Sequence, residues 1–318
     1  MKNLKSRFAE SINKYLNWRE AIGYSRVTDG ALLARFDKYC SEHLPRATEL
    51  TREVVCDWLD SENTSIPNKI TAIRNFARYL NAHDITAYVC PGSGMTIDKA
   101  PYLPYKFTKA EIASLFAAID GIKPTKAHPN IPIVLPVMYR LIYSCGLRPS
   151  EGRELLCESV DFETGAIHII STKGKKERMV VMSDDMRKRL ADYNEKRKVF
   201  AGANPYLFPS ENGCLYKASL IQKWLKDCWS AANHDVPLSK LPSIRVYDLR
   251  HVFATTALTR WIESGANIKA KLGYLRAYMG HESINETLYY VHLLPETLLL
   301  GGKWDTLTDA DFATVEVS

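Results

Sequence analysis

A run rich in proline and glycine divides the chain into two parts. It begins with Pro91-Gly-Ser-Gly-Met95 and continues through Pro101 and Pro104. Such residues interrupt helices and strands, so we expect a linker here. A chain of 318 residues is long for one compact domain and sufficient for two. The sequence predicts a first domain over 1–89, a linker over 90–106, a second domain over 107–295 and a C-terminal tail over 296–318.

The first part carries four stripes of apolar side chains with helical spacing. They predict a small bundle of helices. In the fourth stripe Arg74 and Arg78 lie between the apolar positions, where they either form a solvated helix face or contact a polyanion. The stripes are Phe8, Ile12, Tyr15 and Leu16; Leu32, Leu33, Phe36 and Tyr39; Val54, Val55, Trp58 and Leu59; and Ile70, Ile73, Phe76, Ala77 and Leu80.

The second part is predicted to be mostly helical with one island of strands. A capping box at Thr108-Lys-Ala-Glu111 marks its first helix. The stretches 166–170 and 178–182 have the apolar, β-branched composition of strands. The basic turn over 172–177 between them predicts a β-hairpin with a cationic tip. The expected fold class is therefore mainly α with a small antiparallel β-sheet.

Composition limits the possible settings without fixing a function. Apolar residues make up 46% and charged residues 25%, as in ordinary globular proteins, and the net charge of +6 is compatible with a polyanionic partner without showing one. The seven cysteines are scattered and include no CxxC pair, which argues against disulfides and a zinc site. The longest apolar run, 131–145, contains two prolines and Arg140. We expect a soluble cytoplasmic protein without membrane, metal or cofactor.

Two polar segments stand out early in the second part. In the first, a buried helix is predicted to end at Gly146, so Arg148 is held where the helix stops, with Pro149 fixing the exit of the chain. Glu151 can brace this arginine, although a purely structural Arg–Glu pair explains the segment equally well. The second segment is the hairpin tip with Lys173, Lys175 and Lys176. Such lysines are either solvated or reach into a DNA groove.

Two more polar segments lie near the end of the chain. On a predicted helix over 247–261, Tyr247 and Arg250 are one turn apart and can face the same site, whereas His251 is expected to point elsewhere and to pack or cap. Further on, Ser283-x-x-Glu286 forms a predicted capping box. His281 then lies just before a helix and Tyr290 about two turns into it. Seen alone, this tyrosine belongs more often to a core than to a site.

Taken in chain order, the four segments resemble the tyrosine recombinase family, which includes phage integrases and Xer recombinases. Gly146-Leu-Arg148 with Glu151 is similar to the first arginine box, and Lys173 to the hairpin lysine. Asp248-Leu-Arg250-His251 is similar to the second arginine box, and Gly280-His281 followed by Tyr290 to the box of the nucleophile. The resemblance covers about 107–295. The preceding helices match the family's DNA-clamping, SAM-like domain in size and type only.

The resemblance implies a metal-free strand transfer. Tyr290 would attack the phosphorus and form a 3′-phosphotyrosyl link. Arg148 and Arg250 would hold the non-bridging oxygens, because forked guanidinium donors fit phosphate. His281 would add a donor, Lys173 would protonate the leaving 5′ oxygen, and Glu151 and Asp248 would orient the arginines and the loop. Tyr289 is the alternative nucleophile, but the nine-residue spacing from His281 favours Tyr290.

One position departs from the family pattern. Three residues before the second arginine the family has His, sometimes Lys, whereas this chain has Tyr247. A phenol with an ordinary pKa near 10 can donate a hydrogen bond to phosphate but is a poor base at neutral pH. Tyr247 is therefore a candidate for positioning the phosphate, and it is also the one feature that favours a non-catalytic relative.

The resemblance also implies the partners. They are double-stranded DNA with paired recombination sites and three further copies of the chain, which form a tetramer on two duplexes. The tail is expected either to dock on a neighbouring copy or to be solvated. We expect a mobile-element integrase, nucleoid-associated in a prokaryote. The alternatives are a non-catalytic DNA-binding relative and a type IB topoisomerase or telomere resolvase. The divergent second box favours an element's enzyme over a housekeeping Xer protein.

Overall fold

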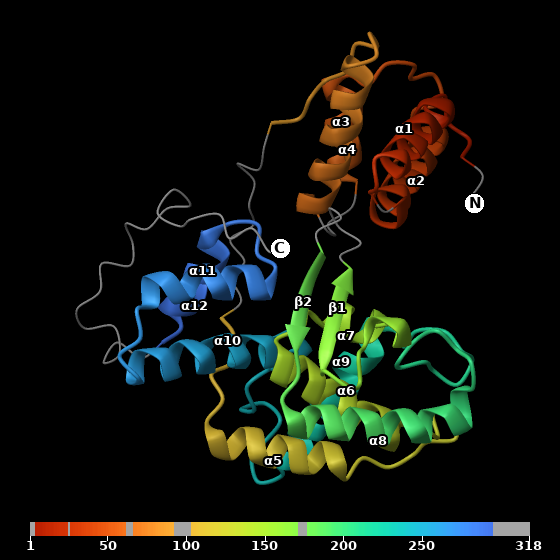
Figure 1. Ribbon diagram of the computed structural model, residues 1–318. Coiled ribbons are helices and arrows are strands. Elements are labelled where there is room, and N and C mark those ends of the chain that lie inside the picture. The colour runs from red at the N-terminus through yellow and green to blue at the C-terminus, as the bar shows by residue number, and fades with distance from the viewer. Residues whose placement is uncertain (1–3, 25, 62–65, 92–102, 171–176, 295–318) are drawn as a thin grey trace. The chain divides into compact units, whose positions relative to one another are not determined.

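The computed structural model describes residues 4–24, 26–61, 66–91, 103–170 and 177–294 (Figure 1). These ranges form two compact units: the first holds helices α1 to α4, and the second holds α5 to α12 with strands β1 and β2. The expected fold class, mainly α with a small antiparallel sheet, is confirmed. Most of the predicted linker and the whole predicted tail lie outside the described residues.

The first unit is built from four amphipathic helices around one core. Each predicted stripe lies on one of them or at its start, and Ile12, Phe36, Val55 and Phe76 are completely buried. A fully buried side chain of this size contributes about 1.5–3 kcal/mol, so the stripes account for the unit's cohesion. The helices are α1 (Ala9–Ala21), α2 (Arg26–His43), α3 (Arg52–Asp60) and α4 (Ile66–Asn81).

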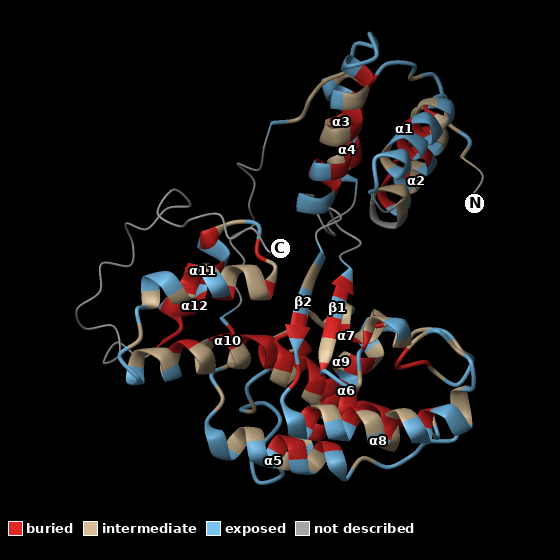
Figure 2. Cartoon of the chain, in the orientation of Figure 1, coloured by how far each residue is buried: buried red, intermediate tan, exposed pale blue. Residues whose placement is uncertain are grey.

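The second unit packs its helices around α6, which is apolar on nearly all sides. Figure 2 shows α6 largely buried, and Val134, Leu135, Leu141 and Ile142 have no exposed surface. The predicted capping box of Thr108 and Glu111 is present and begins α5. The helices are α5 (Lys109–Asp120), α6 (Ile131–Cys145), α7 (Pro149–Glu154), α8 (Asp184–Ala201), α9 (Ala218–Ala232), α10 (Val246–Glu263), α11 (Ile268–Met279) and α12 (Ile284–His292); Cys157–Ser159 forms a 3₁₀ turn.

The predicted hairpin consists of β1 (Ala166–Ile170) and β2 (Glu177–Val181), which pair antiparallel with Ala166 opposite Val181 and Ile170 opposite Glu177. The second strand begins and ends one residue earlier than the sequence predicts. On β2 the completely buried Val180 and the partly buried Arg178 alternate with exposed neighbours. A charged side chain thus shares the inward face of a strand. The connecting residues 171–176, with Lys173, Lys175 and Lys176, lie outside the described residues.

A separate apolar cluster joins α10, α11 and α12. Leu258, Leu272 and Ile284 are completely buried in it. Ser283 is the N-cap residue of α12, as predicted, but its side chain makes no capping hydrogen bond, so the predicted Ser283–Glu286 capping box is wrong. The start of this helix is instead fixed by the burial of Ile284 in its first turn. The cluster thereby holds the C-terminal half of α12 against α10.

Candidate active site

The left-handed end of α6 places Arg148. Gly146 has φ +62°, and a Cβ there would lie 2.5 Å from a ring carbon of Phe253, so both the backbone and the packing require glycine. Three residues later Pro149 opens α7, with Arg148 at the N-cap. The backbone N–H of Arg148 donates to Oε2 of Glu151 at 2.7 Å. The main chain around Arg148 is therefore fixed by the left-handed Gly146 on one side and by Pro149 and the bond to Glu151 on the other, independently of the contacts of its side chain.

Glu151 binds two arginines at once. Its Oε1 accepts from Nη1 of Arg148 at 2.8 Å and from Nη1 of Arg178 at 2.8 Å, and its Oε2 accepts from Nη2 of Arg178 at 2.7 Å. Burial alone would raise the pKa of this carboxyl, but the hydrogen bonds and charge of Arg178, with those of Arg148, hold it at about 2. Glu151 is therefore a fully charged brace at neutral pH.

Three consecutive carbonyls at the C-terminus of α11 each bind a different arginine. Arg178 Nε donates to Tyr278 at 2.8 Å, Arg250 Nη2 to Met279 at 2.7 Å and Arg148 Nη2 to Gly280 at 2.6 Å. The last carbonyls of a helix have no partner within it and carry the negative end of its dipole. The same turn therefore gathers the three guanidinium groups next to His281.

Arg250 is completely buried on α10. Besides the Met279 carbonyl, it donates through Nη1 to the carbonyl of Gly146 at 2.7 Å, and its Nη1 lies 3.9 Å from Oε2 of Glu151. Its Nε has no hydrogen-bond partner among the described residues. A buried guanidinium nitrogen without an acceptor is costly, and it leaves one donor of Arg250 available to an oxygen that enters the site.

His281 is held as a neutral imidazole. Its Nε2 lies 3.1 Å from Nη2 of Arg250, and its Nδ1 lies 2.8 Å from Oγ1 of Thr287. A guanidinium only donates, so Nε2 accepts and Nδ1 carries the proton that Thr287 receives. Burial lowers the pKa of His281 to about 3, and the charges of Arg250, Arg148 and Arg178 act in the same direction. The neutral imidazole with its proton on Nδ1 is thus the form that fits both Arg250 and Thr287.

Tyr290 lies within this group of charges. Only 2% of its surface is exposed, and its ring stacks on that of His281 with centroids 5.7 Å apart and planes 15° apart. Burial raises the pKa of Tyr290, while the charge of Arg250 and a hydrogen bond to Arg250 oppose this effect. Tyr289 is 37% exposed, and neighbouring residues on a helix point about 100° apart. Of the two tyrosines, Tyr290 contacts the arginine group.

The phage integrase family model matches residues 106–297, which is more than half of the chain. The chain belongs to the phage integrase family. The family expected from the four segments, and with it the class of tyrosine site-specific recombinases, is confirmed.

Individual relatives are similar to this chain over most of their own length as well as most of its length. The protein y4rB of Sinorhizobium fredii, assigned as an integrase/recombinase, is 26% identical over 92% of this chain and 95% of its own. The tyrosine recombinase XerD of Pseudomonas putida is 26% identical over 85% of this chain and 86% of its own. The Tn1549 transposon integrase, solved with transposon right-end DNA, superposes with a TM-score of 0.59 at 16% identity over 91% of this chain and 96% of that one. This likeness shows the shared fold.

Within this phage integrase domain, Tyr247 and His251 lie next to each other on α10. Tyr247 is half-buried on α10, and its ring centroid lies 6.0 Å from Cζ of Arg250 and 5.0 Å from the ring of His251. The prediction that His251 points away from the site is wrong, because its ring centroid lies 5.4 Å from that of Tyr290. One turn of helix separates Tyr247 from His251, so their rings lie on the same face of α10. Burial lowers the pKa of His251 to about 4, with Arg245 and Arg250 contributing.

The remaining predicted residues lie elsewhere. Asp248 is completely buried and accepts the backbone N–H of Arg245 at 2.8 Å, so it holds the first turn of α10, the helix that carries Arg250. The hairpin lysines, Lys173, Lys175 and Lys176, lie outside the described residues. On α4 of the first unit, Arg78 is exposed and Arg74 half-buried. A role for these two in DNA binding stays a prediction.

Sequence reasoning missed Arg178 and Thr287. Arg178 follows the hairpin tip by only a few residues, and its position on the inward face of β2 was a usable signal, because charged side chains are rarely placed there without a partner. Thr287 carried no signal, since a buried threonine on a helix is ordinary. Its importance comes from its hydrogen bond to His281, which depends on how the turn before α12 is folded.

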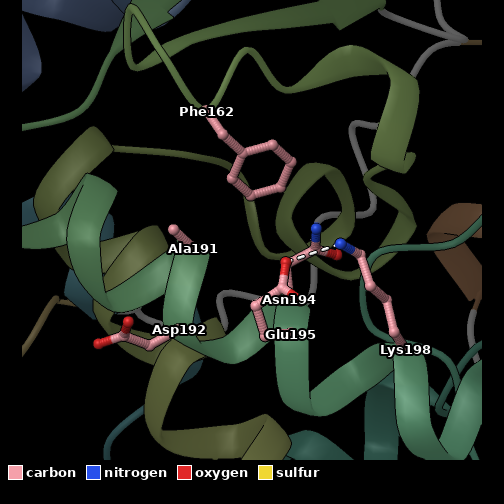
Figure 3. A pocket seen from close by; sticks show the side chains of 6 residues that line it. All are labelled: Phe162, Ala191, Asp192, Asn194, Glu195 and Lys198. Atoms are coloured by element: carbon pink, nitrogen blue, oxygen red, sulfur yellow. Dashed lines mark hydrogen bonds and ion pairs between the residues drawn. The ribbon is translucent and has the colours of Figure 1, made fainter.

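Other features of the described residues do not belong to this site. No group of three or more His, Cys, Asp or Glu side chains there has the arrangement of a metal site. A shallow hollow of about 330 Å³ lies along α8, lined by Phe162, Ala191, Asp192, Asn194, Glu195 and Lys198 (Figure 3). It contains none of the residues discussed above. In the described ranges, no helix is long and apolar enough to cross a membrane.

Proposed function

We propose that this chain cleaves and rejoins DNA strands through a covalent link between Tyr290 and a 3′ phosphate. The observation that carries the proposal is the surroundings of Tyr290: its buried ring contacts the imidazole rings of His251 and His281, and His281 is itself bonded to Arg250. A nucleophile that attacks a phosphodiester needs positive charge around the phosphate and acceptors for its proton. Arg148 and Arg250 supply the positive charge, and the neutral imidazole of His251 supplies the acceptor.

The proposed cleavage step exchanges one bond to phosphorus for another. The Tyr290 oxygen forms a bond to phosphorus, and the bond from phosphorus to the 5′ oxygen breaks. The phenolic proton passes to the neutral imidazole of His251 beside the ring, whose Nδ1 has no hydrogen-bond partner among the described residues, and Lys173 gives a proton to the leaving 5′ oxygen. The free Nε of Arg250 and the partly exposed guanidinium of Arg148 bind the non-bridging oxygens. Attack of another strand's 5′ hydroxyl reverses the step and restores Tyr290.

In this proposal His281 changes its role when the phosphate arrives. In the structure its Nε2 accepts from Arg250. An anion within a few ångström stabilises the charged imidazole and opposes the effect of the surrounding arginines. The pKa of His281 therefore rises on DNA binding, and the imidazole becomes able to donate to a phosphate oxygen. Glu151 holds Arg148 throughout, and Tyr247 donates its hydroxyl hydrogen to the same phosphate.

The proposed partner is double-stranded DNA with paired recombination sites. The integrase solved with transposon DNA supports it, because that protein shares the fold along nearly its whole length. We propose that the first unit, 1–89, clamps the duplex with Arg74 and Arg78 facing it, that Lys175 and Lys176 contact the backbone, and that 107–295 is catalytic. Four copies would act on two duplexes, with the tail docking on a neighbour. The expected setting is a mobile-element integrase on prokaryotic chromosomal DNA.

The proposal is tested by covalent trapping. The wild-type chain, Tyr290→Phe and Tyr289→Phe are incubated with nicked duplexes made from the ends of the element that carries the gene. A short cleaved strand diffuses away from such a substrate, so the protein stays attached to the rest. We expect an adduct that survives denaturing electrophoresis for the wild type and Tyr289→Phe and is absent for Tyr290→Phe.

A non-catalytic DNA-binding relative is the second candidate, and the tyrosine at position 247 favours it. Salt titration shows whether the chain binds DNA at all, because several phosphate contacts make affinity fall steeply with salt. Specific, salt-dependent binding without an adduct from the wild type would favour the second candidate. Adduct formation that is lost only in Tyr290→Phe excludes it.

A further inference from the structure

Arg178 is the one arginine of the site whose three nitrogens are all bonded to the protein. Nη1 and Nη2 donate to the two oxygens of Glu151, and Nε donates to the carbonyl of Tyr278. Its side chain is 9% exposed, against 29% for that of Arg148. A guanidinium engaged in this way holds its neighbours and has little left to offer a phosphate. Its contribution must act through the groups that it binds.

The first of these groups is the carboxylate that Arg148 also uses. Arg178 binds Glu151 end-on, with two parallel hydrogen bonds from Nη1 and Nη2, and such bidentate pairs are among the strong hydrogen-bonding arrangements. Arg148 consequently makes one side-chain hydrogen bond to Glu151 and gives its Nη2 to the carbonyl of Gly280. If Arg178 were absent, Oε2 would keep only its bond to the Arg148 backbone N–H, and both carboxylate oxygens could accept from the Arg148 side chain. A two-bond pair would then draw the Arg148 guanidinium onto Glu151 and away from the phosphate.

The second group is the turn between α11 and His281. Gly280 has φ +65°, and a Cβ there would lie 3.0 Å from Nη1 of Arg178, so the turn and this guanidinium are closely fitted. The carbonyl of Tyr278 is held by Arg178, and the next two carbonyls are held by Arg250 and Arg148. Arg178 thus ties β2, the strand that follows the hairpin tip, to α7 and to the C-terminus of α11.

We infer that Arg178 is a positioning residue for strand cleavage: by occupying both oxygens of Glu151 and fixing the turn at 278–280, it keeps the guanidinium of Arg148 directed at the scissile phosphate. The inference rests on the proposed recombinase function. If it is correct, removing Arg178 lowers the cleavage rate partly because the carboxylate of Glu151 is then free to bind the Arg148 side chain. Removing the charge of Glu151 as well therefore restores part of the cleavage rate.

The test uses the full chain and measures two quantities on a nicked duplex: the affinity for DNA and the rate of adduct formation at saturating DNA. The variants are Arg178→Gln, Arg178→Lys and the double variant Arg178→Gln/Glu151→Gln. Arg187→Gln is the matched control, because Arg187 is an arginine of the same unit that bonds only a backbone carbonyl and Asp184 at the surface. Thermal unfolding of each variant is followed in parallel.

For Arg178→Gln we expect the cleavage rate to fall about a hundredfold, as for a misplacement of about 1 Å in a reacting group, with DNA affinity within about threefold of wild type, since most phosphate contacts remain. Arg178→Lys does not rescue the rate, because an ammonium lacks the planar fork that spans both carboxylate oxygens. The double variant cleaves faster than Arg178→Gln. Arg187→Gln behaves as the wild type.

Two results would overturn the inference. One is a wild-type cleavage rate in Arg178→Gln. The other is a double variant that cleaves no faster than Arg178→Gln, which would leave Arg178 with a structural role only. If Arg178→Gln does not fold, the comparison of Arg178→Lys with Arg178→Lys/Glu151→Gln decides in the same way. Failure of the proposed function looks different, since the wild type itself then binds DNA and forms no adduct.

Discussion

Gly146→Ala tests how the end of α6 builds the site. With φ +62° the position is left-handed, which costs an L residue about 1–2 kcal/mol. The new Cβ also meets Phe253 ring carbons at 2.5 and 2.9 Å and the Met279 sulfur at 3.1 Å. Overpacking of a core costs about 1–3 kcal/mol. We expect the free energy of unfolding to fall by about 2–5 kcal/mol.

Gly265→Ala is the matched control. Gly265 has φ +70°, but nothing lies within 4 Å of its added Cβ, so only the conformational cost of about 1–2 kcal/mol remains. Urea unfolding of both variants, followed on the full chain, gives the difference due to packing. Because the Gly146 carbonyl binds Arg250, Gly146→Ala should also slow adduct formation, whereas Gly265→Ala should not. Equal losses of stability in the two variants would refute the reasoning.

Three further predictions concern charge and hydrogen bonding in the site. The pKa of Glu151 is about 2 in the folded chain, against an ordinary value of 4.5. The ionised carboxylate therefore adds about 3 kcal/mol to the free energy of unfolding above pH 4.5, and this contribution is lost as the pH falls toward 2. In urea unfolding, Glu151→Gln should lack this pH-dependent contribution. The unfolded His281 binds a proton below about pH 6.5 and the folded one only near 3, so acidification to pH 5 should cost the wild type about 2 kcal/mol more than His281→Gln. Tyr247→Phe removes one hydrogen bond to phosphate and should slow adduct formation about tenfold; an unchanged rate means that Tyr247 only packs.

The sequence predicted the parts of the site that depend on neighbouring residues. Gly146, Arg148 and Glu151 lie within one helix end, so their arrangement follows from local rules of capping and helix termination. Tyr290 and His281 were assigned from their spacing, which the resemblance supplied. The helices themselves follow from the spacing of their apolar residues, which the cores of both units confirm.

Interactions between distant segments were not predictable in the same way. Arg178 bonds residues that lie 27 and 100 positions away in the chain. Only the folded chain brings β2, α7 and the end of α11 together. The error at Ser283 has the opposite origin, because the local pattern was correct but burial of the next residue already fixes the helix. His251 was misplaced because the position of α12 against α10 was unknown.

Mapping the covalent attachment site tests the central claim most directly. Adduct formed by the wild-type chain on a nicked duplex is digested with protease and nuclease, and the nucleotide-bearing peptide is sequenced by tandem mass spectrometry. The surroundings of Tyr290 predict a nucleotide on Tyr290 alone. Attachment to Tyr289, or to Tyr247 on α10, would contradict the account of how this site performs strand cleavage.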